Sequence, residues 1–160
     1  MIKMFVMDVD GTLTDGQLYF GDNGELFKRF HVKDGYGIHL LMKHGIIPVI
    51  MTGRISKIVE TRFNELGVTE IHQGIDDKLL KLREIIARYD FQLSEIAYVG
   101  DDESDLDVMM NVGFPFALSN SIGHIKSIAI DISTLSGGDG AVREIIDLII
   151  NNYAKRSESK

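Results

Sequence analysis

Short apolar segments alternate with segments of helical periodicity along almost the whole chain, and this alternation constrains the fold more than any other feature. The apolar segments have the length of buried strands and span residues 3–7, 46–51, 69–73, 96–99, 115–118 and 128–132. The segments between them carry apolar residues near helical spacing and span residues 35–44, 56–66, 78–89, 104–112 and 141–153. Strand–helix alternation requires right-handed crossovers between parallel strands. The sequence therefore predicts an α/β fold, with a parallel sheet covered by helices on both faces.

One segment interrupts the alternation directly after the first strand. Residues 17–20 and 25–30 flank Gly21-Asp22-Asn23-Gly24, which is typical of a tight turn. We expect a β-hairpin over residues 17–30 that projects from the sheet. The length of 160 residues suits one domain, which we expect to span residues 1–153, followed by a frayed polar tail over residues 154–160.

Composition excludes several classes of protein. The chain contains no cysteine, which excludes disulfides, thiolate zinc sites, iron–sulfur clusters and cysteine nucleophiles. Its longest apolar run, residues 46–51, is far shorter than a membrane span, and Asp8 and Asp10 interrupt the only apolar stretch near the N-terminus. The formal charge of −7 argues against nucleic acid as the main partner. We expect a cytoplasmic protein that binds neither membrane nor nucleic acid.

Polar and charged side chains follow the predicted strands at the points where the strands end. Asp8 and Asp10 follow the first strand, Thr52 and Arg54 the second, and Lys78 follows the third at the start of a helix. Residues 100–105 follow the fourth strand and include three aspartates. Because ligands of open parallel sheets bind beyond the carboxyl ends of the strands, we expect these side chains to meet at one edge.

The carboxylates at this edge indicate a divalent cation. An extended chain points Asp8 and Asp10 the same way, and Asp101 would add a third anion beside them. Carboxylates this close repel one another unless a cation lies between them, and Mg²⁺ prefers a few carboxylates together with a substrate phosphate. The sequence predicts Mg²⁺ bound by Asp8, Asp10 and Asp101. The competing interpretation is an acidic turn cluster without an ion.

A carboxylate can act as the nucleophile that receives a phosphoryl group. We expect Asp8 to attack phosphorus and Asp10 to protonate the departing alkoxide, then to deprotonate the hydrolytic water. Thr52 and Lys78 would bind the non-bridging phosphate oxygens. Asp102 and Asp105 are expected behind the metal ligands. Asp105 would orient Lys78 or a metal-bound water, or would otherwise be a solvated acid of the first helical turn.

Residues 8–14, Thr52, Lys78 and residues 100–105 resemble the four signature motifs of the haloacid dehalogenase superfamily of phosphatases. The resemblance extends to a capless subfamily that hydrolyses 3-deoxy-D-manno-octulosonate 8-phosphate, a sugar-acid phosphate monoester. Its further matching residues are the hairpin, Lys28, Phe30, and residues 33–38, 52–54, 73–74 and 137–144.

This resemblance implies a Rossmann-like sheet without a separate cap domain, an aspartyl-phosphate intermediate, and a hairpin that acts as a flap. It implies a homotetramer in which a neighbouring subunit closes the site. The substrate contacts that it implies are Asp10, His31, Val32, Lys33, Asp34, Gly35, His39, Arg54, Arg62 and Lys78. Relatives often carry arginine at the position of His39, so this contact departs from the family pattern. Residues 137–140 are interpreted as a glycine-rich start of the last helix, packed near the flap or a neighbour.

Three other functions compete with this hypothesis. A sister branch acts on nine-carbon 2-keto-3-deoxy sugar acid 9-phosphates, but it tends to carry glutamate where this chain has Arg54, which favours the eight-carbon substrate. A phospho-acceptor signalling module would need an aspartate at the end of the third strand, where residues 70–74 contain none. An inactive oligomeric domain is disfavoured by the intact pair of Asp8 and Asp10.

Overall fold

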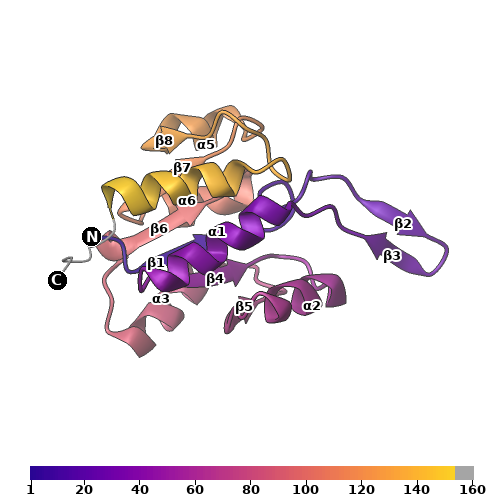
Figure 1. The fold of residues 1–160 in the computed structure, drawn as a ribbon, viewed down its shortest axis with the longest axis horizontal. Coiled ribbons are helices and arrows are strands. Elements are labelled where there is room, and N and C mark those ends of the chain that lie inside the picture. The colour runs from indigo at the N-terminus through magenta and orange to yellow at the C-terminus, as the bar shows by residue number, and fades with distance from the viewer. Residues whose placement is uncertain (154–160) are drawn as a thin grey trace.

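Six parallel strands form the central sheet of the computed structural model, which describes residues 1–153 (Figure 1). Their order is β5-β4-β1-β6-β7-β8. The strands are β1 (Met4–Met7), β4 (Ile47–Met51), β5 (Glu70–His72), β6 (Ile96–Val99), β7 (Phe114–Ala117) and β8 (Asp131–Ile132). Because β1 lies between β4 and β6, the residues that follow these three strands meet at the middle of one sheet edge.

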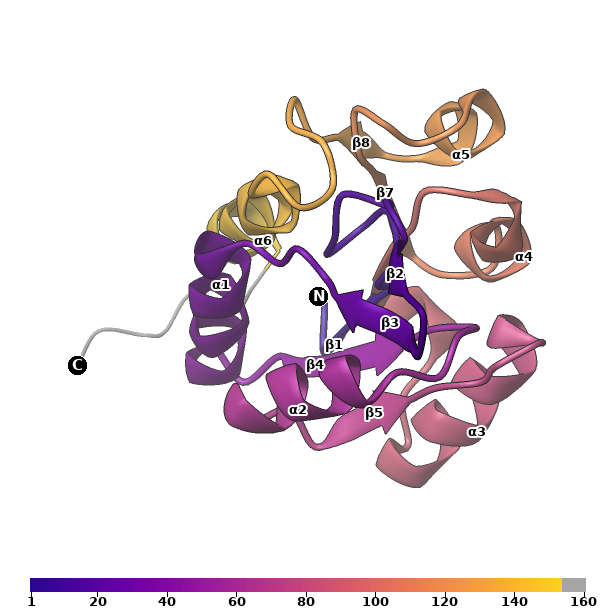
Figure 2. The same ribbon diagram turned by 90° about the vertical axis from the view of Figure 1, so that its right-hand side faces the viewer.

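Helices cover both faces of the sheet, as predicted (Figure 2). One face packs against α1 (Val32–Lys43), α2 (Lys57–Glu65) and α6 (Ala141–Asn152). The other packs against α3 (Lys78–Tyr89), α4 (Leu106–Met109) and α5 (Gly123–Ile128). Two short 3₁₀ turns, Leu93–Glu95 and Glu103–Asp105, precede β6 and α4. Among residues 1–153, no helix has the length and apolar character that crossing a membrane requires.

The alternation of side chains along each strand builds two separate cores. In β1, Phe5 and Met7 face the core under α1 and α6, whereas Met4 and Val6 face the core under α3. All four side chains are fully buried. Burying an apolar side chain of this size contributes about 1.5–3 kcal/mol, so β1 is anchored on both faces. The first strand is therefore a rigid base for the residues that follow it.

The hairpin consists of β2 (Tyr19–Gly21) and β3 (Gly24–Phe27), which pair antiparallel and project away from the sheet (Figure 1). The stacked rings of Tyr19 and Phe27, with centroids 4.3 Å apart, hold the two strands together. The observed strands are shorter than the expected residues 17–20 and 25–30.

Three elements differ from the sequence prediction. The helix expected over residues 104–112 is divided into the 3₁₀ turn Glu103–Asp105 and the one-turn helix α4, because Asp105 accepts hydrogen bonds from the N–H groups of Asp101 and Asp102. The strand expected over residues 128–132 is only Asp131–Ile132, and the helix α5 precedes it. Helix α1 begins at Val32 rather than residue 35, because the His31 ring accepts a hydrogen bond from the Lys33 N–H.

The expected tail over residues 154–160 lies outside the described residues, and the single domain over residues 1–153 stays a prediction.

Candidate active site

The predicted catalytic residues meet at the carboxyl edge of the sheet. Asp8 directly follows β1, Thr52 directly follows β4, and Lys78 is the first residue of α3. Each of the three is buried. Asp101 lies two residues beyond the end of β6, at the same edge. The topology therefore brings together side chains that are as much as 93 positions apart in the chain, since Asp8 and Asp101 are neighbours in space.

Lys78 joins two of the carboxylates. Its Nζ donates to Asp8 Oδ1 at 2.9 Å and to Asp105 Oδ1 at 2.6 Å. Asp105 is fully buried and also accepts hydrogen bonds from the Tyr98 hydroxyl at 2.7 Å and from the N–H groups of Asp101 and Asp102. The many partners of Asp105 make it an anchor for Lys78. Of the roles considered from the sequence, the structure favours this one over a solvated acid.

The carboxylates at this edge carry more negative charge than Lys78 can neutralise. Burial and the nearby Asp105 carboxylate raise the pKa of Asp8 well above its usual range, although Lys78 opposes the shift. Burial and Asp105 also raise the pKa of Asp101 to about 6. Burial would lower the pKa of Lys78, but Asp8 and Asp105 outweigh it and raise that pKa.

This surplus of negative charge fits a divalent cation. Oxygen atoms of Asp8, Asp101 and Asp105 lie within 4.8 Å of one another. Oxygen ligands at such spacing suit Mg²⁺. Because Asp105 is already held by Lys78, Tyr98 and two backbone groups, Asp8 and Asp101 are the side chains best placed to hold the ion.

Asp10 lies apart from this cluster. Its Oδ1 accepts a hydrogen bond from Lys28 Nζ at 2.6 Å, and its Oδ2 lies 4.0 Å from Arg54 Nε. The side chain that we expected among the metal ligands is thus paired with two cations. Its roles in metal binding and in proton transfer stay predictions.

The loop after β1 depends on glycine at two places. Gly11 has a φ of +85°, and a Cβ there would overlap the Asp101 carboxylate. Gly137 packs against the backbone of Gly11 and Thr14, and the Asn120 amide bridges the Gly11 carbonyl and the Gly137 N–H. The glycine-rich segment 137–140 therefore supports the Asp8 loop. Asp139 of the same segment also pairs with Arg29, near the end of the expected hairpin, with 3.0 Å between Arg29 Nη2 and Asp139 Oδ1. The segment therefore also lies near the flap, as expected.

The expected substrate-binding residues fall into two groups. Arg54 lies beside Asp10, half-exposed, with its guanidinium 5.7 Å from the centre of the Phe20 ring in the hairpin. The second group surrounds the start of α1, where Gly35 lies against the Arg62 guanidinium. Its other members are His31, Val32, Lys33 and Asp34, of which only Asp34 is buried. His39 lies exposed on α1, outside both groups.

Asp102, which we expected behind the metal ligands, is exposed. It accepts a hydrogen bond from the Glu103 N–H, so it serves the turn before α4.

Sequence reasoning missed two contributors. Tyr98 lies in the apolar run of β6, and its single hydroxyl was the only signal that this strand carries a polar group. Lys28 is among the residues that carry the family resemblance, but the sequence indicates no role for it, because nothing local shows that the hairpin returns it to Asp10.

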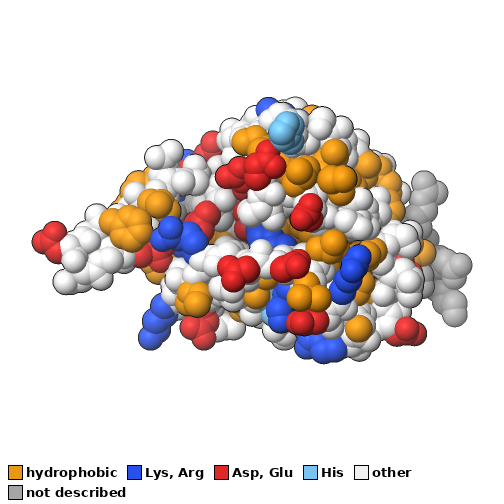
Figure 3. Space-filling model, turned by 180° about the vertical axis from the view of Figure 1, so that it is seen from behind, with side chains coloured by type: hydrophobic (Ala, Val, Ile, Leu, Met, Phe, Trp, Pro, Cys, Tyr) orange, Lys and Arg blue, Asp and Glu red, His pale blue; other side chains and the backbone are white. Residues whose placement is uncertain are grey.

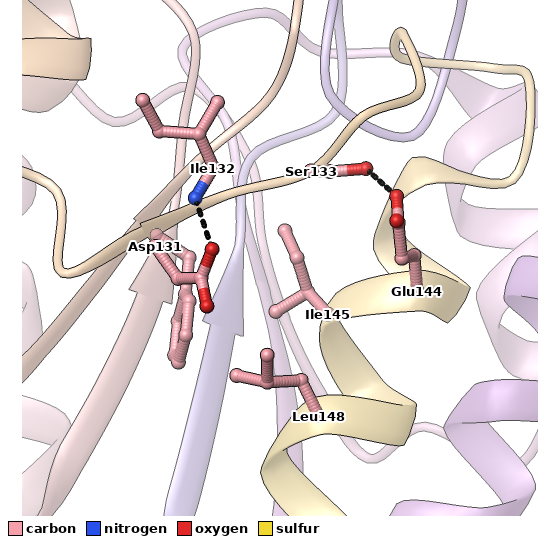
Figure 4. A pocket seen from close by; sticks show the side chains of 7 residues that line it. Asp131, Ile132, Ser133, Glu144, Ile145 and Leu148 are labelled. Atoms are coloured by element: carbon pink, nitrogen blue, oxygen red, sulfur yellow. Dashed lines mark hydrogen bonds between the residues drawn. The ribbon is translucent and has the colours of Figure 1, made fainter.

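The small cavity in Figure 4 lies apart from these residues. It measures about 40 Å³ and lies between β8 and α6, where Glu144 accepts a hydrogen bond from the Ser133 hydroxyl (Figure 4). Its lining contains none of the acidic residues described above. The acidic edge, and not this cavity, is therefore the candidate active site.

Comparison with known proteins identifies the family of the chain. A family model described as haloacid dehalogenase-like hydrolase matches residues 55–146. The 3-deoxy-D-manno-octulosonate 8-phosphate phosphatase of Yersinia pestis is 42% identical over 149 residues, covering 93% of this chain and 80% of that protein. The corresponding enzyme of Escherichia coli (strain K12) is 39% identical over 159 residues, covering 99% of this chain and 85% of that protein.

Solved structures of similar sequence have the same fold. The 3-deoxy-D-manno-octulosonate 8-phosphate phosphatase of Moraxella catarrhalis, in complex with a magnesium ion, a phosphate ion and a KDO molecule, superposes with a TM-score of 0.91 at 43% identity. The match covers 94% of this chain and 86% of that chain. The cobalt-bound enzyme of Haemophilus influenzae also has a TM-score of 0.91, at 36% identity, covering 94% of this chain and 88% of that chain.

Carboxylates paired with a lysine at the carboxyl edge of a parallel α/β sheet suit phosphoryl transfer, and the relatives place this chain among the hydrolases. The chain belongs to the haloacid dehalogenase-like hydrolases, as its sequence motifs indicated.

Proposed function

We propose that this protein is a Mg²⁺-dependent phosphatase that converts 3-deoxy-D-manno-octulosonate 8-phosphate to the free sugar acid and phosphate. The observation that carries the proposal is the bridge from Lys78 to Asp8 and Asp105 beside Asp101. The names of the relatives support the substrate, because those proteins match this chain over most of its length.

In the first step, an Asp8 oxygen attacks phosphorus and the bond from phosphorus to the sugar oxygen breaks. Asp10 gives its proton to that oxygen, so the oxygen leaves as a neutral hydroxyl group of the sugar acid. Lys78 and Thr52 bind the non-bridging oxygens, where negative charge must be stabilised. Mg²⁺ bound by Asp8 and Asp101 would neutralise the repulsion between the phosphate and the carboxylates.

In the second step, water attacks the aspartyl phosphate on Asp8. Asp10, now ionised, takes a proton from this water, and the bond between phosphorus and the Asp8 oxygen breaks. Phosphate and the original carboxylate are restored, so Asp10 returns in its protonated form for the next substrate. Asp105 keeps Lys78 in place through both steps.

The substrate contacts and the assembly form the finer part of this proposal. Arg54, Arg62 and the segment from His31 to Gly35 would hold the sugar acid, with His39 at the margin.

The hairpin would act as a flap over the site, in a homotetramer. Its exposed side chains Leu18, Phe20, Leu26 and Phe27 support this assembly, since monomers rarely expose so much adjacent apolar surface. Figure 3 shows apolar side chains on the projecting hairpin. A cytoplasmic location suits a chain without cysteine.

The test is phosphate release with Mg²⁺ from a panel of phosphate esters. The panel holds eight-carbon and nine-carbon keto-sugar acid phosphates and a simple hexose phosphate. We expect the highest kcat/KM for the eight-carbon acid and loss of activity after chelation of Mg²⁺. Preference for the nine-carbon acid would reassign the substrate within the same reaction. No release from any ester would refute the proposed function.

A further inference from the structure

Lys28 forms the closest contact between the hairpin and the proposed catalytic machinery. It follows β3 directly, and its Nζ lies 2.6 Å from Asp10 Oδ1 and 2.8 Å from Glu25 Oε1. The Lys28 side chain is only 3% exposed. Exposed ion pairs contribute little to stability, whereas removal of one partner of a buried pair has large effects. A buried lysine between two carboxylates therefore needs an explanation beyond solubility.

Glu25 is itself fixed from the opposite side. Its Oε2 accepts a hydrogen bond from the Ser56 hydroxyl at 2.5 Å, and Ser56 is the residue before α2. The Ser56 N–H in turn donates to the Gln73 side chain. Lys28 is thus held by a carboxylate that the body of the protein positions, and it does not simply follow movements of the hairpin tip.

The two oxygens of Asp10 have different surroundings. Oδ1 is occupied by Lys28, whereas Oδ2 lies on the side of Arg54, at 4.0 Å from its Nε. Arg54 is the residue that we expect to bind the carboxylate of the sugar acid. Oδ2 therefore faces the side from which the substrate's leaving group would approach, next to Arg54.

We propose that Lys28 is a positioning residue for Asp10: it holds Oδ1 so that Oδ2 is presented to the leaving-group oxygen and then to the hydrolytic water. This inference rests on the proposed phosphatase function. It adds a residue that acts through Asp10 without touching the reacting phosphorus. It also gives the base of the hairpin a role in the chemistry, separate from any role of its tip in closing the site.

The first test compares Lys28→Met, which keeps an unbranched side chain one atom shorter and without charge, with Lys28→Arg. Correct placement of a general acid or base is worth about 10²–10⁴-fold in rate, and mispositioning forfeits part of it. We expect Lys28→Met to lower kcat about 10- to 100-fold with KM within about twofold of wild type. Lys28→Arg should recover most of kcat, because it restores a buried cation beside Asp10. The matched control is Lys43→Met, at the exposed end of α1, which should behave as wild type.

The second test asks whether Lys28 acts through Asp10. In an Asp10→Asn background, Lys28→Met should cause no further loss of kcat, since residues that act as a unit are non-additive. If Lys28→Met lowers kcat by the same factor in the Asp10→Asn background as in wild type, the proposal is overturned in favour of a role in anchoring the hairpin. The same holds if Lys28→Met raises KM and leaves kcat unchanged. A kcat of Lys28→Arg no higher than that of Lys28→Met would overturn the proposal as well.

Thermal unfolding of each variant shows whether a loss of rate reflects a loss of fold. If Lys28→Met is unfolded, Glu25→Gln decides, because it keeps the pair of Lys28 and Asp10 but weakens the anchor. We expect Glu25→Gln to lower kcat severalfold at unchanged KM, and an unchanged kcat would count against the proposal. An inactive wild type would refute the proposed function itself, whereas an active wild type with a fully active Lys28→Met refutes only this inference.

Discussion

At the scale of single residues, the burial of Asp8 makes its charge costly to the fold. Desolvation and the Asp105 carboxylate both disfavour the charge of Asp8, and Lys78 offsets only part of that penalty. We expect Asp8→Asn to abolish turnover, because an amide cannot attack phosphorus. Without metal, the variant should be at least as stable as wild type, since a buried charge is removed. Magnesium-dependent activity and thermal unfolding in a chelator measure the two effects. Substantial activity in purified Asp8→Asn would show that Asp8 is not the nucleophile.

Arg54 is the residue that should separate the sugar acid from simpler esters. Its half-exposed guanidinium lies beyond Asp10, and a planar guanidinium suits a carboxylate through two parallel hydrogen bonds. A charge-assisted hydrogen bond is worth about 1.5–3 kcal/mol, or roughly 10- to 150-fold. Arg54→Ala should lower kcat/KM for the eight-carbon acid phosphate by such a factor and barely change it for a small aryl phosphate. Steady-state kinetics with both esters measure this, and equal losses would mean that Arg54 serves only the phosphate or Asp10.

At the scale of elements, α6 depends on a residue from another helix. Its first turn follows Gly140, which offers no side-chain cap, and the Arg143 N–H donates to Asp34 Oδ1 of α1 at 2.9 Å. Loss of this acceptor would leave a partly buried N–H unsatisfied, at a cost of about 1–3 kcal/mol. We expect Asp34→Ala to be clearly less stable than Asp34→Asn, which keeps an oxygen at this position. Urea unfolding of the two variants measures the difference, and equal stabilities would contradict this role.

The ionisation of Asp34 should also make the stability of the fold depend on pH. Burial raises its pKa to about 6, and the Arg143 N–H opposes this shift only in part. Because the pKa of Asp34 is raised in the folded state, its protonated carboxyl contributes fully to the free energy of unfolding below about pH 4. This contribution is lost as the pH rises through about 6. The stability of Asp34→Asn relative to wild type should therefore increase between pH 4.5 and 7.5. A constant difference across this range would show that Asp34 titrates normally.

Element patterns were predictable where the controlling forces are local. The alternation that buries Phe5 and Met7 on one face and Met4 and Val6 on the other is visible in the sequence, and so is the turn of the hairpin. The short helix α5 and the two-residue strand β8 carry too few residues for a period to appear. The contact of Lys28 with Asp10 depends on how the hairpin meets the sheet, which no local pattern contains.

At the scale of the whole molecule, the hairpin is the part whose apolar side chains stay exposed. A two-stranded hairpin is marginally stable alone, and this one is tied to the body by Lys28, which directly follows β3, and by Glu25, beside the turn. Contact with the hairpins of other copies would bury these side chains. It would also place neighbouring subunits beside each active site, since Arg54 already lies against Phe20 of the hairpin.

The substitution Leu26→Glu tests this assembly. Leu26 is 62% exposed on β3, so a charge there should cost the isolated subunit little but should oppose burial between copies. We expect the wild type to sediment as a tetramer, and Leu26→Glu to shift toward smaller species with a lower kcat/KM for the sugar-acid phosphate. Met110→Glu is the matched control, since Met110 is 65% exposed at the end of α4, an element outside the hairpin. A wild type that sediments as a monomer at micromolar concentration would refute the tetramer. If Leu26→Glu forms smaller species at full activity, each subunit completes its own site, and the hairpin serves assembly alone.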